Sequence, residues 1–209
     1  MRTPKFRNTA RLLLWMKRHG WGERLPSHSE QVFFNSKKED PSTIAVNLAT
    51  YAWVAGKLEL PFESVLKNSP MAVVDYAKML LARVNEKISE DLQDSLKGCS
   101  AQLVQLAQVY KERLPARLED TICEPYWALD YAKSVLRGRL PSHLECVFFK
   151  DPRIASRYAF EVIRGFSPVM LPDELHSFMI MKSFENPDDD SIKRYIEASE
   201  SDPSKIGNH

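Results

Sequence analysis

The stretch RLPSHSEQVFF (residues 24–34) returns 115 residues later as RLPSHLECVFF (residues 139–149), and nine of the eleven positions are identical. Self-similarity over such a distance is typical of proteins that are built from repeated units. Each copy begins with a Leu-Pro step and continues into polar residues and then into the apolar pattern of a short helix. The rest of the chain carries weaker copies of the same unit.

Two landmarks recur along the chain. The Leu-Pro step occurs at Leu25-Pro26, Leu60-Pro61, Leu114-Pro115, Leu140-Pro141 and Leu171-Pro172, with Ile88-Ser89 in the remaining place. A Tyr-Ala pair occurs at Tyr51, Tyr76, Tyr131 and Tyr158, and Leu106-Ala107 takes the place of one pair. About six units with a period of 25–35 residues therefore fit into the chain.

A third landmark predicts where the longer helix of each unit begins. A polar residue precedes proline or stands alone at Asp40-Pro41, Ser69-Pro70, Ser100, Glu124-Pro125, Asp151-Pro152 and Asn186-Pro187. Such residues cap helices, and proline suits the first helical position. A shorter helix follows each Leu-Pro step, and helices this short are stable only when they pack on neighbours. We predict an all-α fold of stacked helix-turn-helix repeats, either α-solenoid-like or a compact helical array.

The predicted organisation is one helical repeat domain over residues 1–185, followed by an acidic C-terminal helix and a frayed tail over residues 186–209. Residues 84–100 are the most degenerate unit, and they are expected to form a bend between two three-repeat halves. Residues 1–40 hold nine Lys/Arg against four Asp/Glu, a net charge of +5, whereas residues 171–209 hold four against nine, a net charge of −5. Partner surfaces at the two ends should therefore differ in sign.

The composition and motifs argue against several classes. No apolar stretch reaches the roughly 20 residues of a membrane span, and no secretory signal is recognised, so a cytoplasmic protein is expected. Nucleotide-binding, metalloprotease and serine-hydrolase motifs are missing from the sequence. The three cysteines lack zinc spacing and are expected to be reduced and partly buried. We therefore expect no enzyme activity, no catalytic residue, no metal and no cofactor.

The pairs His28-x-Glu30 and His143-x-Glu145 are the strongest candidates for chemistry. Residues two apart on a helix do not face each other, so this spacing does not make a metal site. We interpret both pairs as first-turn residues of the short helix, where glutamate complements the helix dipole. The acidic run of residues 188–190 is interpreted in the same way, as the first turn of a final helix.

A row of cations is the candidate binding feature that remains. The residue before the Leu-Pro step, or before its substitute, is Arg24, Glu59, Lys87, Arg113, Arg139 or Met170. The four cations would align along one edge of a stacked array and contact an acidic partner, or they would only neutralise helix C-termini. Among the tryptophans, Trp15, Trp53 and Trp127 are expected in the core. Trp21, in the loop HGWGER, is expected to be exposed and to contact a partner, or else to pack over the end of the array.

The unit pattern, best seen in residues 131–152 and 158–178, resembles the short helical-hairpin repeats of early and accessory proteins of large tailed bacteriophages. This resemblance implies a small binding protein that acts on host or viral machinery. The leading hypothesis is therefore a non-catalytic protein that binds a macromolecule, most plausibly a host protein, as a host-takeover or anti-defence factor. The partner surface would lie on the short-helix starts and the turns between helices. The alternatives are a nucleic-acid-binding protein that uses the basic edge, and a helical-repeat enzyme such as a DNA glycosylase.

Overall fold

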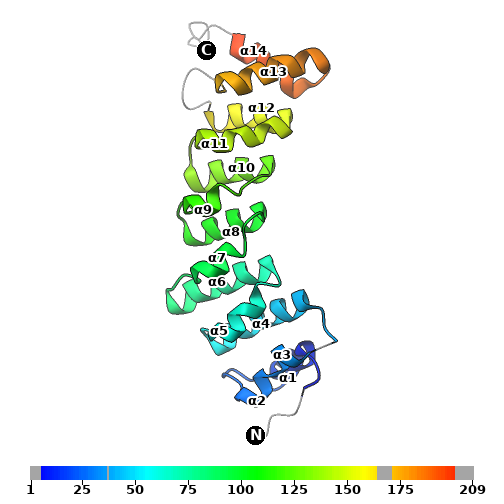
Figure 1. Ribbon diagram of the computed structural model, residues 1–209, viewed down its shortest axis with the longest axis vertical. Helices are drawn as coiled ribbons and strands as arrows, with labels where there is room; N and C mark the ends of the chain where they lie inside the picture. The colour runs from blue at the N-terminus through cyan, green and yellow to red at the C-terminus, as the bar shows by residue number, and fades with distance from the viewer. Residues whose placement is uncertain (1–5, 37, 164–170, 201–209) are drawn as a thin grey trace. The chain divides into compact units, whose positions relative to one another are not determined.

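The computed structural model describes residues 6–36, 38–163 and 171–200, and every regular element within these ranges is a helix, with no strand (Figure 1). The prediction of an all-α fold is confirmed. The chain divides into two compact units, which are residues 1–110 (unit 1) and residues 111–209 (unit 2). The bend expected over residues 84–100 stays a prediction.

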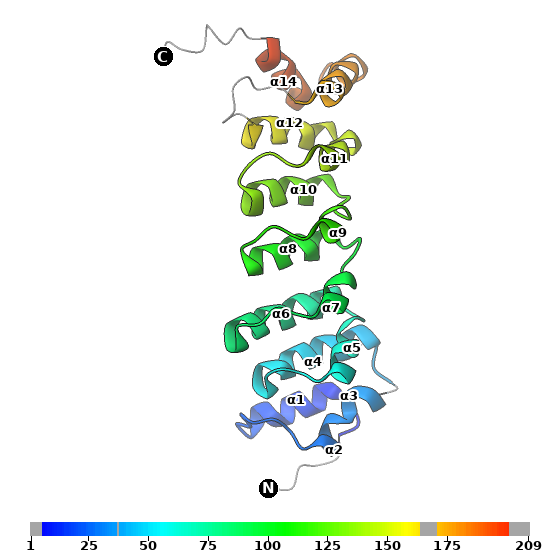
Figure 2. The same ribbon diagram turned by 60° about the vertical axis from the view of Figure 1, so that its left-hand side comes forward.

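Unit 1 has a layer of longer helices and a layer of shorter ones. Among the longer helices, α4 packs against both α1 and α6, and α6 packs against α8 (Figure 2). Among the shorter helices, α3 packs on α5 and α5 packs on α7. The longer helices are α1 (Thr9–Arg18), α4 (Pro41–Ala55), α6 (Pro70–Val84) and α8 (Ser100–Tyr110). The shorter helices are α2 (Ser27–Glu30), α3 (Val32–Asn35), α5 (Leu60–Leu66) and α7 (Glu90–Asp94).

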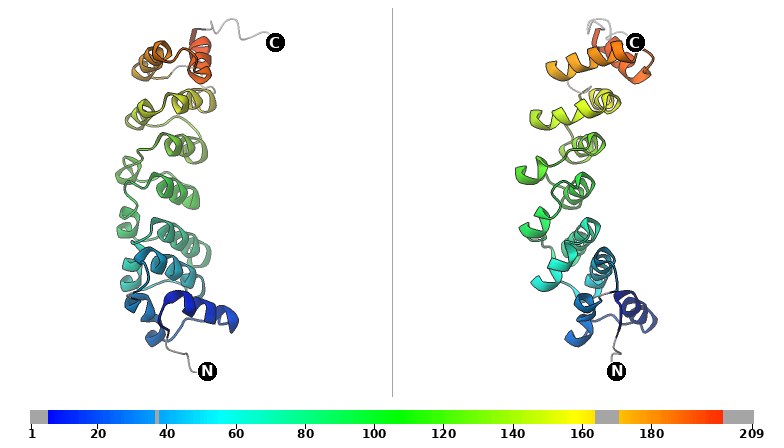
Figure 3. Two further views of the ribbon diagram at one scale, coloured as in Figure 1. Left: turned by 90° about the vertical axis from the view of Figure 1, so that its right-hand side faces the viewer. Right: turned by 45° about the vertical axis from the view of Figure 1, so that its right-hand side comes forward.

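Unit 2 is built in the same way. α10 (Pro125–Tyr131) continues into a π-helical segment, η1 (Ala132–Leu136). α10 packs on α12 (Pro152–Glu161), and α12 packs on α14 (Asp190–Glu200) (Figure 3). The other helices are α9 (Ala116–Glu119), α11 (Ser142–Glu145) with its 3-10 extension η2 (Cys146–Lys150), and α13 (Asp173–Glu185), on which η2 packs.

Three of the six predicted capping residues cap a helix. Asp40, Ser69 and Asp151 each accept a hydrogen bond from a backbone N–H in the first turn of their helix, and proline occupies the first position. α10 begins at Pro125 as predicted, but Glu124 makes no side-chain cap hydrogen bond, and Ser100 is the first residue of α8 instead of the residue before it. The prediction at Asn186-Pro187 is wrong. α14 begins at Asp190, because the Asp189 side chain accepts a hydrogen bond from the Ser191 N–H and so caps the helix later.

Burial corrects two of the expectations for individual residues. Trp53 was expected in the core, but it lies on the outward side of α4 and is 44% exposed. Trp15 and Trp127 are half-buried. The cysteines form no disulfide, but only Cys99 is partly buried, because Cys123 and Cys146 are exposed at the ends of short helical turns. The core consists instead of aliphatic residues and of the tyrosines Tyr51, Tyr76, Tyr131, Tyr158 and Tyr195.

Candidate functional site

A buried tyrosine joins the start of a short helix to the longer helix that follows it. The hydroxyl of Tyr158, on α12, donates to Oε1 of Glu145 at 2.8 Å and accepts from the backbone nitrogen of Leu140 at 2.8 Å. Arg139 donates hydrogen bonds to both carboxylate oxygens of Glu145, from Nε at 2.8 Å and from Nη2 at 3.2 Å. The bidentate arginine and the hydroxyl together satisfy a carboxylate that lies almost wholly out of solvent.

The two other copies that begin with arginine have the same geometry. In the first copy, Arg24 binds Glu30 at 2.9 and 3.4 Å, and the Tyr51 hydroxyl donates to Glu30 at 2.7 Å. In the copy at residue 113, Arg113 binds Glu119 at 2.9 and 2.7 Å, and Tyr131 donates to it at 2.7 Å. The backbone nitrogens of Leu25 and Leu114 donate to the two hydroxyls at 2.8 and 3.0 Å. The three glutamates are only 1–4% exposed.

The remaining copies keep the tyrosine and vary its partners. The Leu58 nitrogen donates to the Tyr76 hydroxyl at 2.9 Å, and that hydroxyl donates to Glu63 at 3.2 Å. The residue before the contacted leucine is therefore Lys57, so the prediction that placed Glu59 at this position is wrong by two residues. That prediction used the Leu60-Pro61 step as its landmark, but this step lies inside α5 and not at the tyrosine contact.

The third and sixth copies replace the glutamate. The Ile88 nitrogen donates to the Tyr110 hydroxyl at 3.0 Å, and Gln93 stands in the place of the acid. Tyr110 lies one helical turn beyond Leu106, the residue that the Tyr-Ala pattern had selected. In the sixth copy, the Leu171 nitrogen donates to the Tyr195 hydroxyl at 3.4 Å, and His176 Nδ1 lies 2.7 Å from the same oxygen.

The electrostatics of these contacts hold the proton on four of the buried tyrosines and the charge on the three arginines. Burial raises the pKa of Tyr51, Tyr76, Tyr131 and Tyr158, so each hydroxyl keeps its proton. Hydrogen bonding to the neighbouring glutamate raises the pKa of Arg24, Arg113 and Arg139. None of the tyrosines is thereby activated as a nucleophile or a base.

The contact corrects our interpretation of Glu30 and Glu145. Both glutamates occupy the short helix as predicted, but they do not merely complement the helix dipole. Their carboxylates are buried and bridge the arginine to the tyrosine of the next helix. Because an unpaired buried carboxylate is strongly unfavourable, the contact specifies how two helices meet.

Each of the four predicted cations holds the same position in its own copy, directly before the residue whose backbone nitrogen donates to the tyrosine. Arg24 and Lys87 belong to unit 1, and Arg113 and Arg139 belong to unit 2. Each of the arginines pairs with the glutamate of its own copy, and Arg24 also pairs with Glu59 at 3.1 Å. Lys87 lies over the Tyr110 ring at 5.4 Å from the centroid. Met170 lies outside the described residues.

Trp21 is not the exposed aromatic that the loop HGWGER predicted. Its ring is half-buried against Trp15, with 5.4 Å between the centroids, and its indole Nε1 is buried with no hydrogen-bond partner. Its backbone nitrogen donates to the Met16 carbonyl at 2.9 Å. The alternative that Trp21 packs over an end of the helical layer agrees with this position.

The histidines next to the buried glutamates are exposed. His143 Nε2 lies 2.8 Å from Asp120 Oδ1 of the preceding short helix, and His28 lines a surface pocket. Within the ranges that the structure describes, no group of three or more His, Cys, Asp or Glu side chains is arranged to hold a metal ion. In the same ranges, no helix is long and apolar enough to cross a bilayer.

The sequence reasoning missed exposed apolar side chains that recur at one position of several longer helices. Met71, five residues before Tyr76, is 58% exposed, and Tyr126, five residues before Tyr131, is 55% exposed. Val46 holds the same position relative to Tyr51. Trp53 lies seven residues beyond Val46, about two turns further along the same face of α4. Counting outward from each buried tyrosine would have found them, since residues at a fixed offset from a buried position share one helix face.

Comparisons of the chain with protein-family profiles, with curated proteins and with solved structures found no match.

Proposed function

We propose that the chain is a non-catalytic helical-repeat protein that binds another protein through the outward face of its longer helices. Its six copies of the tyrosine contact would form the scaffold, in an α-solenoid-like or compact array. The resemblance of its repeats to phage accessory proteins further suggests a phage-encoded factor that acts on a host protein, in host takeover or in countering defence. One observation carries the proposal: the arginines and glutamates are paired with one another inside the fold, whereas apolar side chains are exposed on the longer helices.

The polar groups that first suggested chemistry are used inside the fold. Arg24, Arg113 and Arg139 each hold a buried glutamate, and each of these glutamates also accepts from a tyrosine. Groups that satisfy one another in this way are structural, because diverting one of them to a ligand leaves a buried charge unpaired. This supports a scaffold role for the short-helix starts, which the sequence had favoured as the partner surface.

The outward face of the longer helices has the opposite character. In unit 1, Val46, Trp53 and Met71 are exposed on α4 and α6, which pack side by side. Polar residues such as Thr50 and Lys78 are exposed on the same two helices. An aromatic or methionine side chain set among polar neighbours is the composition that protein interfaces favour. We define Val46, Trp53 and Met71 as the outer face of unit 1.

The proposal is tested by affinity capture from bacterial lysate followed by mass spectrometry. The wild-type chain should retain one stoichiometric protein, and Trp53→Asp with Met71→Asp should release it. Lys17→Asp is the matched control, because it changes an exposed residue of α1 outside the outer face. If the wild-type chain retains no stoichiometric protein, or if the outer-face variant retains it unchanged, the proposal is wrong.

Nucleic-acid binding is the second candidate, favoured by the guanidinium groups of Arg113 and Arg139, whose side chains are about half exposed. Binding to labelled DNA and RNA at low and high salt separates the two proposals, since phosphate contacts weaken steeply with salt. The third candidate, a helical-repeat enzyme such as a DNA glycosylase, would show base release from a damaged duplex. Neither assay is expected to give a signal if the chain is a protein-binding scaffold.

A further inference from the structure

Within each unit, neighbouring short helices contact one another through two defined faces. The residue nine positions after the tyrosine-bound leucine contacts the next short helix. Phe34 packs on Phe62 with 4.7 Å between ring centroids, and Phe149 packs on Phe178 at 5.2 Å. Lys67 forms an ion pair with Asp91, and the Cys123 carbonyl accepts from Lys150 at 2.8 Å. We call the side that carries this residue the donating face of a short helix.

The receiving side is equally regular. The contacted residues stand three, four, seven or ten positions after the tyrosine-bound residue of their own copy, as Asp91, Phe62, Phe178 and Lys150 do. That residue is Ile88 for Asp91 and a leucine for the others. His143, at the third position, extends the pattern by contacting Asp120 of the preceding short helix. We call this side the receiving face. Among the described residues, these contacts bring no short helix onto the receiving face of α2 and α3 or onto the donating face of α13.

The last donating face lies on α13 and is apolar. Ile180 stands nine positions after Leu171, where Phe34 and Phe149 stand in their own copies. Ile180, Met181 and Phe184 are 38%, 48% and 81% exposed. These three residues lie at helical spacing on one side of α13, which continues for more than a turn beyond the length of the other short helices of unit 2. A phenylalanine exposed to this degree at the end of an apolar stripe marks an interaction surface.

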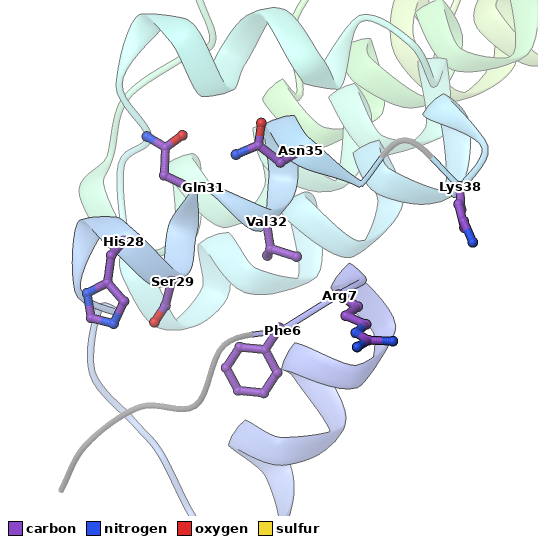
Figure 4. A pocket seen from close by; sticks show the side chains of 8 residues that line it. All are labelled: Phe6, Arg7, His28, Ser29, Gln31, Val32, Asn35 and Lys38. Atoms are coloured by element: carbon purple, nitrogen blue, oxygen red, sulfur yellow. The ribbon is translucent and has the colours of Figure 1, made fainter.

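The first receiving face lies on α2 and α3 and forms a pocket of about 520 Å³ (Figure 4). Its wall includes His28, Ser29, Val32 and Asn35, which are the third, fourth, seventh and tenth residues after Leu25. In Figure 4, Val32 points toward Phe6, and Arg7 and Lys38 lie at one side of the pocket. The floor is therefore apolar, and the rim on that side carries two cations.

The charges of the two faces are complementary. Around α13 and the turn after it, Glu174 and Asp188 are exposed, and Glu185 pairs with Lys182 of the same helix at 2.5 Å. Around the pocket, Arg7 and Lys38 are exposed. These residues belong to chain ends of opposite sign, since the first 40 residues carry a net +5 and residues 171–209 a net −5. Opposite potentials favour encounter of the two faces and disfavour contact of either face with itself.

We propose that the occupant of each face is a second copy of this chain, joined head to tail. The α13 stripe of one copy would lie on α2 and α3 of the next, with Phe184 entering the pocket between Phe6 and Val32. Such a contact is heterologous, so it extends into chains or closes into rings. This inference goes beyond the proposed function, because it needs no other protein and uses neither Trp53 nor Met71.

Sedimentation velocity of the purified chain over a range of concentrations tests the proposal. The wild-type chain should form concentration-dependent oligomers, and Phe184→Asp should weaken association by about thirtyfold or more, as expected for a central aromatic contact. Tyr126→Asp is the matched control, because it places the same charge on another exposed aromatic residue and should leave association unchanged. A wild-type chain that stays monomeric at every concentration overturns the proposal, as does an unaffected Phe184→Asp variant.

A mixing experiment then identifies the direction of the contact. Phe184→Asp keeps a competent pocket, and a double variant with Asn35→Glu and Lys38→Glu keeps a competent α13. Both changed residues of the double variant are exposed, and circular dichroism checks that the fold is retained. Each variant alone should be monomeric, and an equimolar mixture should give a one-to-one dimer and nothing larger. If the mixture stays monomeric, or if the pocket variant associates with itself, the contact is not head to tail.

Discussion

The phenol of Tyr158 and the carboxylate of Glu145 meet at 2.8 Å in the core, although they come from different helices and are 13 residues apart. The same pairing recurs between Tyr51 and Glu30 and between Tyr131 and Glu119. It is the contact that the two near-identical sequence stretches share, and it explains why their Arg and Glu are kept together.

Replacing Tyr158 by phenylalanine should destabilise the chain. The change leaves the Leu140 N–H without its acceptor and removes a donor from Glu145, and both groups are buried. The expected loss is about 1–3 kcal/mol in the free energy of unfolding. Urea unfolding measures it, with Tyr126→Phe as the control at an exposed position. Equal stability of the two variants would show that the hydroxyl of Tyr158 contributes nothing.

Replacing Arg139 alone should lower the free energy of unfolding more than replacing both Arg139 and Glu145 by uncharged residues. Arg139→Leu leaves the buried carboxylate with Tyr158 alone, and we expect a loss of about 2 kcal/mol. Adding Glu145→Gln removes the charge and keeps an acceptor for Tyr158, so most of the loss should be regained. Unfolding midpoints of the wild type and the single and double variants measure the difference. A double variant less stable than Arg139→Leu contradicts the account.

The buried tyrosines should also make the fold sensitive to high pH. Burial raises their pKa in the folded state above the ordinary value of 10.0. Their contribution is therefore complete below pH 10.0 and is lost as the pH rises above it, because the unfolded chain releases these protons first. Urea unfolding from neutral pH to about pH 11 should show stability falling at the alkaline end. The fall should be shallower in Tyr158→Phe, and an identical slope would contradict this assignment.

The cap of α12 offers a local test. The Asp151 side chain accepts from the backbone N–H groups of Arg153 and Ile154, at 3.0 and 3.4 Å. Asp151→Ala should therefore lower stability by about 1 kcal/mol. Asp188→Ala, in the exposed turn before α14, should have a smaller effect by thermal unfolding. If Asp188→Ala lowers stability more than Asp151→Ala does, the cap does not stabilise α12.

The sequence was sufficient for the helical class and for most of the helix starts, because proline and capping residues act locally. The tyrosine contact was not predicted, although its residues were identified, because Glu30 and Tyr51 are brought together only by the folded chain. A false landmark at Leu60-Pro61 hid the position of Lys57, which the tyrosine contact defines. Trp53 was misplaced because apolar spacing on a long helix does not show which apolar side is covered.

Photo-crosslinking from position 71 tests the central claim that the outer face binds a protein. A photoreactive residue in place of Met71 should crosslink to one protein in bacterial lysate, and mass spectrometry identifies it. The same residue at Lys97, which is exposed beyond the short helix α7, should not crosslink to that protein. Crosslinking to one protein from position 71 alone agrees with the account. No crosslinked protein from position 71, or the same protein from both positions, contradicts it.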